Sequence, residues 1–271
     1  MIKFFRKIRQ NLLSEGKTGK YLKYAVGEII LVVIGILIAL QINNWNENRK
    51  LAKLELSYYE NLYHDLIEDS LEIDFKIKNA ERNIRQIENV LRFIENDYDI
   101  TKTRIDLVEW PVNHFYQDSL ALIISVSQAG FLQFVDIMKN TIEDLRSTGN
   151  IKVLKNEALK RSLLLYYNRD KTRETWNATL IEARIDMEKS INKVLTAAQR
   201  TAYAKSEIMQ LQRDEFQKFV QKLKAEPAFE EHLIGMLYLH NRIIIQGNSL
   251  MKGYVTVLLD DLRNEIQKHK T

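Results

Sequence analysis

An unbroken apolar run extends from Ile29 to Leu40, and aromatic residues stand on both sides of it. A helix rises about 1.5 Å per residue, so residues 24–45 would cover roughly 31 Å, close to the thickness of a bilayer hydrocarbon core. Tyrosine and tryptophan are enriched at the two membrane–water interfaces. The pattern predicts a transmembrane helix over residues 21–45, with three membrane-interface residues, Tyr21, Tyr24 and Trp45.

A secretory signal peptide is the alternative interpretation of this run, because Glu28 and Gln41 closely bound its apolar residues. Cleavage would require small residues three and one positions before the cut. Residues 37–43 contain no A-x-A pattern, and the leader before the run is long for a signal peptide. The sequence therefore favours an uncleaved anchor.

Beyond the anchor, apolar residues recur at alternating intervals of four and three, which is the spacing of one packed face of a helix. Residues from Leu51 to Leu66 begin this pattern. We expect one helix to run from the anchor to about Asn96. Its clearest apolar seam is Ile73, Ile77, Ala80, Ile84, Ile87, Leu91 and Ile94.

Two more long helical patterns follow. The first spans residues 159–194 and contains a polar gap at residues 169–171. The second begins after Pro227 and extends toward the end of the chain. Its predicted seam is Leu233, Leu237, His240, Ile244, Gly247, Met251, Tyr254 and Leu258.

Shorter helices are expected between the long ones. Residues 120–126 and residues 211–223 are apolar enough to form two of them, although a strand is the alternative for the first. A third should run from Asn140 to Gly149, where Asn140 and Glu143 have the spacing of a capping box. Asn156 stands in the same way before the 159–194 pattern.

These elements predict an all-α fold, in which an N-terminal transmembrane helix continues into an elongated antiparallel helical bundle. The presence of only two prolines agrees with long helices. The expected organisation is a basic amphipathic cytoplasmic leader over residues 1–20, the transmembrane helix over 21–45, and one extracytoplasmic helical-bundle domain over 46–271.

Charge is distributed unevenly along the chain. Residues 1–24 carry seven basic side chains and one acidic side chain, a net charge of +6, whereas the whole chain carries +4, so the remainder carries −2. Basic residues beside a membrane span stay on the cytoplasmic side. We therefore expect the N-terminus in the cytoplasm and residues 46–271 outside it, in the periplasm of a bacterium. The lipid bilayer is an expected partner, and nucleic acid is not.

Little in the sequence points to catalysis. The chain has no cysteine, so thiol chemistry and disulfides are excluded. Glu60, His64 and Glu68 share one helix face, but their spacing differs from that of di-iron bundles, and surface ion pairing is the simpler interpretation. The sequence contains no G-x-S-x-G motif, and no glycine-rich loop follows a strand to bind phosphate. We expect no enzymatic activity, no metal and no cofactor.

The polar gap in the 159–194 pattern is the candidate ligand-binding site, although a solvated face or an ion pair would give the same pattern. Two functions remain open. The first is a scaffold or interaction module that binds another envelope protein, or itself, through helix faces. The alternative is a sensor of a small ligand, which would need a partner membrane protein to transmit its signal. The residues of the candidate site are Tyr166, Tyr167, Arg169, Asp170, Arg173 and Trp176.

Residues 27–47, with the sequence GEIILVVIGILIALQINNWNE, resemble the opening signature of an uncharacterised family of single-pass inner-membrane proteins of Bacteroidota. Residues 145–167 and 257–266 are similar to the central and C-terminal segments of that family. Residues 98–135 carry no such likeness. The resemblance implies the architecture and an envelope location, and it transfers no catalytic residue.

Overall fold

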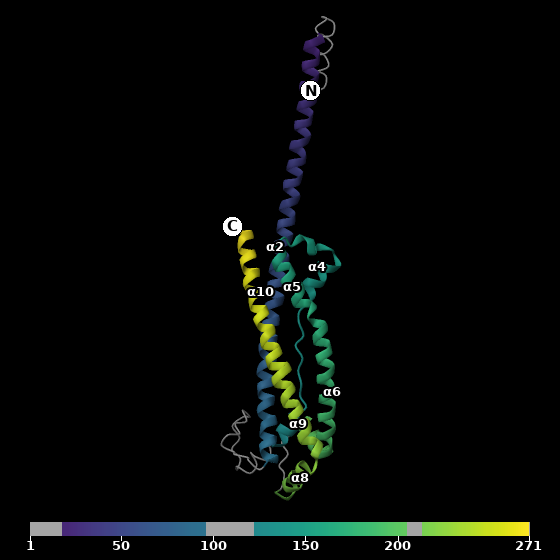
Figure 1. The fold of residues 1–271 in the computed structure, drawn as a ribbon, viewed down its shortest axis with the longest axis vertical. Coiled ribbons are helices and arrows are strands. Elements are labelled where there is room, and N and C mark those ends of the chain that lie inside the picture. The colour runs from purple at the N-terminus through teal and green to yellow at the C-terminus, as the bar shows by residue number, and fades with distance from the viewer. Residues whose placement is uncertain (1–17, 96–121, 205–212, 271) are drawn as a thin grey trace. The chain divides into compact units, whose positions relative to one another are not determined.

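A computed structural model describes residues 18–95, 122–204 and 213–270 of the chain. All regular elements in these ranges are helices, which confirms the predicted all-α fold (Figure 1). In chain order they are α2 (Thr18–Ile94), a short helix over residues 122–128, α4 (Asn140–Ser147), the 3₁₀ helix η1 (Asn150–Val153), α5 (Glu157–Asn168), α6 (Asp170–Val194), α7 (Ala197–Ala204), α8 (Arg213–Ala225), α9 (Pro227–Leu239), the π-helix η2 (His240–Ile245) and α10 (Gln246–Lys270).

The chain divides into two compact units, residues 1–57 and residues 58–271, and α2 contributes to both. In the first unit, the structure describes only the N-terminal part of α2. The predicted leader lies outside the described residues as far as residue 17. The second unit holds the rest of α2 and every other described element.

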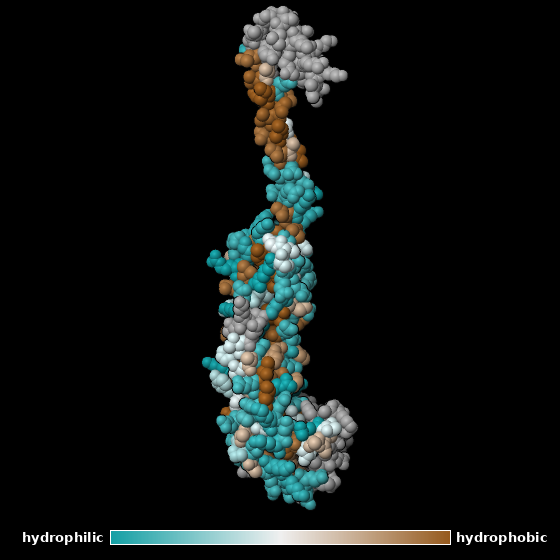
Figure 2. Space-filling model, turned by 90° about the vertical axis from the view of Figure 1, so that its right-hand side faces the viewer, coloured by the Kyte–Doolittle hydropathy of each residue, from teal (hydrophilic) through white to brown (hydrophobic). Residues whose placement is uncertain are grey.

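The first part of α2 carries apolar side chains on all of its sides. The large apolar side chains between Ile29 and Leu40 have exposed fractions from 47% to 64%. Figure 2 shows this stretch as a continuous apolar surface. By length and composition, this is the one helix among the described residues that could cross a membrane, a property that signal sequences share.

Two clusters of buried apolar side chains form the core of the second unit, and both include residues of α2. One contains Leu62 and Leu66 of α2 with buried residues of α4, α5 and α10. The other contains Ile87 and Val90 of α2 with residues of α6, α8, α9 and the 122–128 helix. Helix α2 therefore supplies one wall of the whole core.

Helix α10 runs antiparallel to α2. Asp74 of α2 forms an ion pair with Lys252, and Glu60 forms one with Lys270 at 3.0 Å, so earlier residues of α2 meet later residues of α10. Helices α6 and α9 also lie side by side, and Lys193 at the end of α6 forms an ion pair with Glu226 at 2.8 Å. The second unit is thus an antiparallel bundle, as the helical patterns predicted.

Several helix limits agree with the periodicity of the sequence. Helix α2 ends at Ile94, two residues before the expected Asn96, and α8 covers most of the predicted 211–223 helix. Residues 122–128 are helical, which excludes the alternative strand. The 159–194 pattern divides at Arg169 into α5 and α6, at the predicted polar gap.

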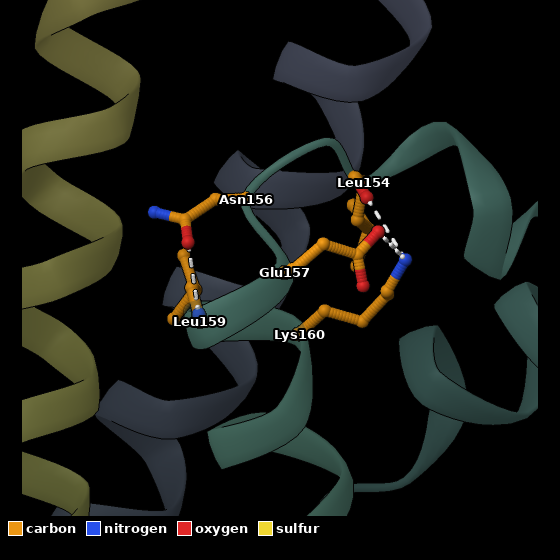
Figure 3. A network of polar contacts seen from close by, with 5 residues as sticks. All are labelled: Leu154, Asn156, Glu157, Leu159 and Lys160. Carbon is orange, nitrogen blue, oxygen red and sulfur yellow. Dashed lines mark hydrogen bonds and ion pairs between the residues drawn. The ribbon is translucent and has the colours of Figure 1, made fainter.

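The start of α5 is fixed by local polar contacts (Figure 3). Asn156 is the N-cap residue, and its Oδ1 accepts a hydrogen bond of 3.0 Å from the backbone N–H of Leu159. Lys160 Nζ lies 2.6 Å from Glu157 Oε1 and donates to the carbonyl of Leu154 at 3.4 Å. The bond from Asn156 satisfies one of the backbone N–H groups that the first turn of a helix leaves unpaired.

The predicted capping box at Asn140 is wrong. Asn140 is the first residue of α4 instead of the residue before it, and no side chain of the N-cap residue bonds to the helix. The backbone N–H of Thr141 donates instead to Asp65 Oδ2 of α2, at 3.2 Å. The first turn of α4 is therefore satisfied by a residue far away in the sequence, which a local motif does not reveal.

The predicted seam of the last helix is confirmed in part. Leu233, His240, Ile244 and Leu258 are buried, and Met251 packs against the core. Gly247 and Tyr254 are exposed, contrary to expectation. Within α10 the buried face passes through Val255 in place of Tyr254, and it continues to Leu262.

The π-helix η2 precedes α10, and its turn is closed by hydrogen bonds between residues five apart. Such a turn takes in one residue more than an α-helical turn. The extra residue changes where the intervals of four and three fall, so Val255 is buried in place of Tyr254 while Met251 and Leu258 keep their predicted places. The repeat in the sequence does not reveal this insertion.

Replacing Leu262 with alanine should test the buried face of α10. We expect the substitution to lower the free energy of unfolding by about 2–5 kcal/mol, because it leaves a cavity at a fully buried position. The matched control is Val257→Ala on the exposed face of α10, which should change it by less than about 0.5 kcal/mol. Urea unfolding of the full chain in detergent, followed by circular dichroism, measures both. Equal effects would contradict the assigned face.

Candidate functional site

Residues 131–139 form an extended segment that runs along α2 in the opposite direction (Figure 1). Phe131, at the start of the segment, bonds to residue 83 of α2. Thr141, two residues after its end, bonds to residue 65. Eighteen helical residues rise roughly 27 Å, and ten residues can cover that distance only when nearly extended. The segment therefore cannot form helical hydrogen bonds, and its buried polar groups need other partners.

Polar side chains of α2 supply these partners. Asn83 Nδ2 donates to the carbonyl of Phe131 at 3.1 Å. Asn79 Nδ2 donates to Gln133 Oε1 at 2.7 Å. Asp69 Oδ1 accepts from the backbone N–H of Met138 at 2.7 Å. We call this set of α2 side chains the polar column: Asp65, Asp69, Asn79 and Asn83.

Asp69 is the centre of the column. Its side chain is fully buried, and Oδ2 accepts a hydrogen bond of 2.7 Å from the hydroxyl of Tyr166. Burial raises the pKa of Asp69 to about 6, and neighbouring Asp65 acts in the same direction. The two hydrogen bonds and the positive charge of Arg173 oppose this rise in pKa. Burial and the adjacent carboxylate also raise the pKa of the Tyr166 hydroxyl above its ordinary value.

His240 lies at the other end of the segment. Its ring is buried, with Nδ1 at 2.8 Å from the carbonyl of Met236 and Nε2 at 3.3 Å from that of Phe131. Burial lowers the pKa of His240, so the ring is neutral at pH 7. Nδ1–H then donates to Met236, and the other nitrogen lies 3.5 Å from Asn83 Nδ2. His240 thus connects the π-helix with the polar column.

A serine and a histidine approach each other at a third place. Ser190 Oγ of α6 lies 2.8 Å from His232 Nδ1 of α9. Nucleophilic catalysis needs a serine oxygen that a substrate can reach. Ser190 is buried within the helix pair, so we interpret the contact as part of the packing of α6 against α9.

The predicted site residues whose side chains the structure describes lie in different surroundings. Tyr166 and Tyr167 are buried in the core, and Arg173 acts on Asp69 from α6. Arg169 instead stacks on the ring of Tyr254 at 4.1 Å, and Trp176 is half exposed. The side chain of Asp170 lies outside the described residues.

A shallow hollow of about 250 Å³ lies on α5. It contains none of the six predicted residues. Its lining consists of Glu157, Lys160, Arg161, Leu164, Leu165 and Asn168.

The residues of the polar column are not among the predicted site residues. Asp65, Asp69, Asn79 and Asn83 stand on the same helix as the apolar seam, and polar residues in that pattern usually belong to the solvated face. Only the position of residues 131–139 shows that they point inward. Of the predicted membrane-interface residues, Trp45 is exposed, and the side chains of Tyr21 and Tyr24 lie outside the described residues.

Two neighbouring tyrosines offer a matched test of the column. Tyr166→Phe removes the hydroxyl that bonds to Asp69, and we expect it to lower the free energy of unfolding by about 1.5–3 kcal/mol. Tyr167→Phe removes a buried hydroxyl that has no hydrogen-bond partner among the described residues, so it should be neutral or stabilising. Denaturant unfolding of the full chain compares the two. A larger loss for Tyr167→Phe would contradict the assignment.

The raised pKa of Asp69 predicts a pH dependence. An aspartate whose pKa is about 6 when folded and 3.8 when unfolded favours folding below pH 4, and this contribution disappears as pH rises through 6. Asp69→Asn removes the titration while keeping an acceptor for Met138. From pH 4.5 to pH 7.5, the stability of this variant relative to the native chain should therefore rise by about 1–3 kcal/mol. Exposed Asp136→Asn is the control and should show no such change.

Residues 28–110 match the model of a family described as a family of unknown function (DUF6090). No curated protein and no solved structure matches the chain. The match includes the exposed apolar part of α2 and all four residues of the polar column. The expected similarity to a family of unknown function is therefore confirmed over this range, while the taxon and the membrane context stay predictions.

Proposed function

We propose that the protein is a single-pass inner-membrane protein of the bacterial envelope, and that its helical unit is an interaction or scaffold module in the periplasm. The observation that carries the proposal is the apolar surface of α2 between Ile29 and Leu40, which no other part of the described structure covers. An apolar helix of this length exposed to water would be strongly unfavourable. A bilayer would cover all sides of it.

The charge of the leader supports the orientation. Residues 1–24 carry +6, and the residues after the anchor are acidic overall. Basic segments next to a span are retained on the cytoplasmic side, so the helical unit would lie outside the cytoplasm.

The second unit supports an interaction module more than a sensor. The described side chains of the candidate pocket are divided between the core, where Tyr166 and Tyr167 are buried, and the surface, where Arg169 stacks on Tyr254. Helix α10, in contrast, exposes Leu250, Tyr254 and Val257, with exposed fractions of 70%, 48% and 60%. Residues spaced by four and three on one face are the contacts by which one helix binds another. The proposed partner is a helix of a second envelope protein.

Reporter fusions after Thr271 test the topology. Alkaline phosphatase, which folds only in an oxidising compartment, should be active there, and a fluorescent protein that matures only in the cytoplasm should stay dark. Peptides of residues 1–24 should also remain in the membrane fraction, because the anchor is not cleaved. Fluorescence without phosphatase activity would contradict the orientation, and loss of the leader peptides would favour a signal peptide.

Photocrosslinking in living cells tests the interaction. A photoreactive residue at position 250 or 257 should capture a discrete envelope protein, identified by mass spectrometry. The control position is Asn264, which is exposed and polar on the same helix. Equal capture at position 264 would contradict a specific apolar contact, and adducts containing only this chain would indicate self-association in place of a second protein.

A further inference from the structure

Trp45, Arg49 and Lys53 form a column along one face of α2 just after the exposed apolar stretch. They are spaced by four residues, so each lies about 40° from the one before it around the helix axis. Trp45 is 63% exposed, and both basic side chains are exposed. All three belong to the first unit, and their arrangement depends only on the helical backbone of α2.

In the part of the chain that the structure describes, no acidic side chain pairs with the basic residues of this face. The guanidinium of Arg49 lies over the ring of Trp45, 5.5 Å from its centroid. Among the described residues, no carboxylate lies within ion-pairing distance of Arg49 or Lys53. The nearby acid Glu47 pairs with Lys50 at 2.9 Å, and helical geometry places this pair on another side of α2.

We propose that Trp45, Arg49 and Lys53 bind the headgroup phosphate of an anionic phospholipid in the leaflet on the side of the helical unit. The inference rests on the proposed function, because it requires α2 to cross the bilayer with Trp45 at that interface. It adds the chemical class of the lipid and the residues that recognise it.

Helix geometry directs these side chains toward the lipid. The bond from Cα to Cβ tilts toward the N-terminus of a helix, and here the N-terminal direction is the direction of the membrane. Arg49 and Lys53 lie about 6 Å and 12 Å beyond Trp45 along the axis, and their long side chains can reach back to the headgroup region. The guanidinium of Arg49 lies over the ring of Trp45, so this side chain does point toward the N-terminus of the helix.

The chemistry of the face selects an anionic headgroup. A guanidinium presents two parallel N–H donors that match the oxygens of a phosphate, and the lysine adds a second positive charge. A zwitterionic headgroup carries its own cation, which the two uncompensated charges of this face would repel. Each basic residue near an anionic membrane surface strengthens binding by about fivefold.

Quenching of Trp45 fluorescence tests the site in the full chain. The protein is reconstituted into phosphatidylcholine vesicles that contain a small fraction of nitroxide-labelled phosphatidylglycerol or nitroxide-labelled phosphatidylcholine. Subtracting the emission of the Trp45→Phe variant isolates the signal of Trp45. The basic leader lies on the other side of the predicted span, roughly 31 Å away, so this signal reports lipids near Trp45.

We expect labelled phosphatidylglycerol to quench Trp45 about two- to fivefold more strongly than labelled phosphatidylcholine. The double variant Arg49→Gln and Lys53→Gln should bring this ratio close to one. The control double variant, Lys218→Gln and Lys222→Gln, removes the same charge from exposed positions of α8 and should leave the ratio unchanged.

The outcomes separate the inference from the function on which it rests. Equal quenching by both lipids, or a ratio that survives the Arg49 and Lys53 substitutions, would overturn the lipid site and leave the membrane span intact. If neither label quenches Trp45 and the protein does not float with the vesicles, the proposed membrane anchoring itself fails.

Discussion

The second unit depends on satisfying the backbone of residues 131–139. This extended segment lacks helical hydrogen bonds, and among the described residues no strand lies beside it. Any of its backbone groups that is buried without a partner costs about 1–3 kcal/mol. The polar column on α2 removes part of this cost by bonding to Phe131 and Met138. Because it does so, Leu132 and Ile137 of the segment can be buried in the two core clusters and connect them.

Bonding to the segment requires burial of the Asp69 carboxylate, and this burial costs free energy. A fully buried carboxylate is unfavourable unless it is hydrogen-bonded, and Asp69 accepts bonds from both the segment and Tyr166 of α5. A neutral asparagine would avoid the charge, but a carboxylate forms stronger bonds to the two donors. The raised pKa shows that burial outweighs these bonds. At neutral pH, Asp69 therefore orients the segment and α5 more than it adds net stability.

Local periodicity predicted the helices well and the long-range contacts poorly. The end of α2 and the break at Arg169 follow from the spacing of apolar residues and from a run of polar ones. The cap of α4 and the burial of Val255 in place of Tyr254 do not, because they depend on Asp65 and on the π-helical turn at His240. Tyr166 was a candidate because it stands beside a polar gap, whereas Asp69 has the sequence surroundings of an ordinary surface acid. Only the fold distinguishes them.

Helix α2 has opposite arrangements in its two parts. Around Leu31 the apolar side chains point outward on all sides, whereas at Asp69 and Asn83 polar side chains point inward. Each arrangement is stable in a different surrounding, since lipid covers an apolar exterior and a protein core can supply partners for buried polar groups. Arg49 lies at the change between them, exposed and without a carboxylate partner among the described residues. If α2 leaves a bilayer at this point, Arg49 lies beside the phospholipid headgroups, which present anionic groups to it.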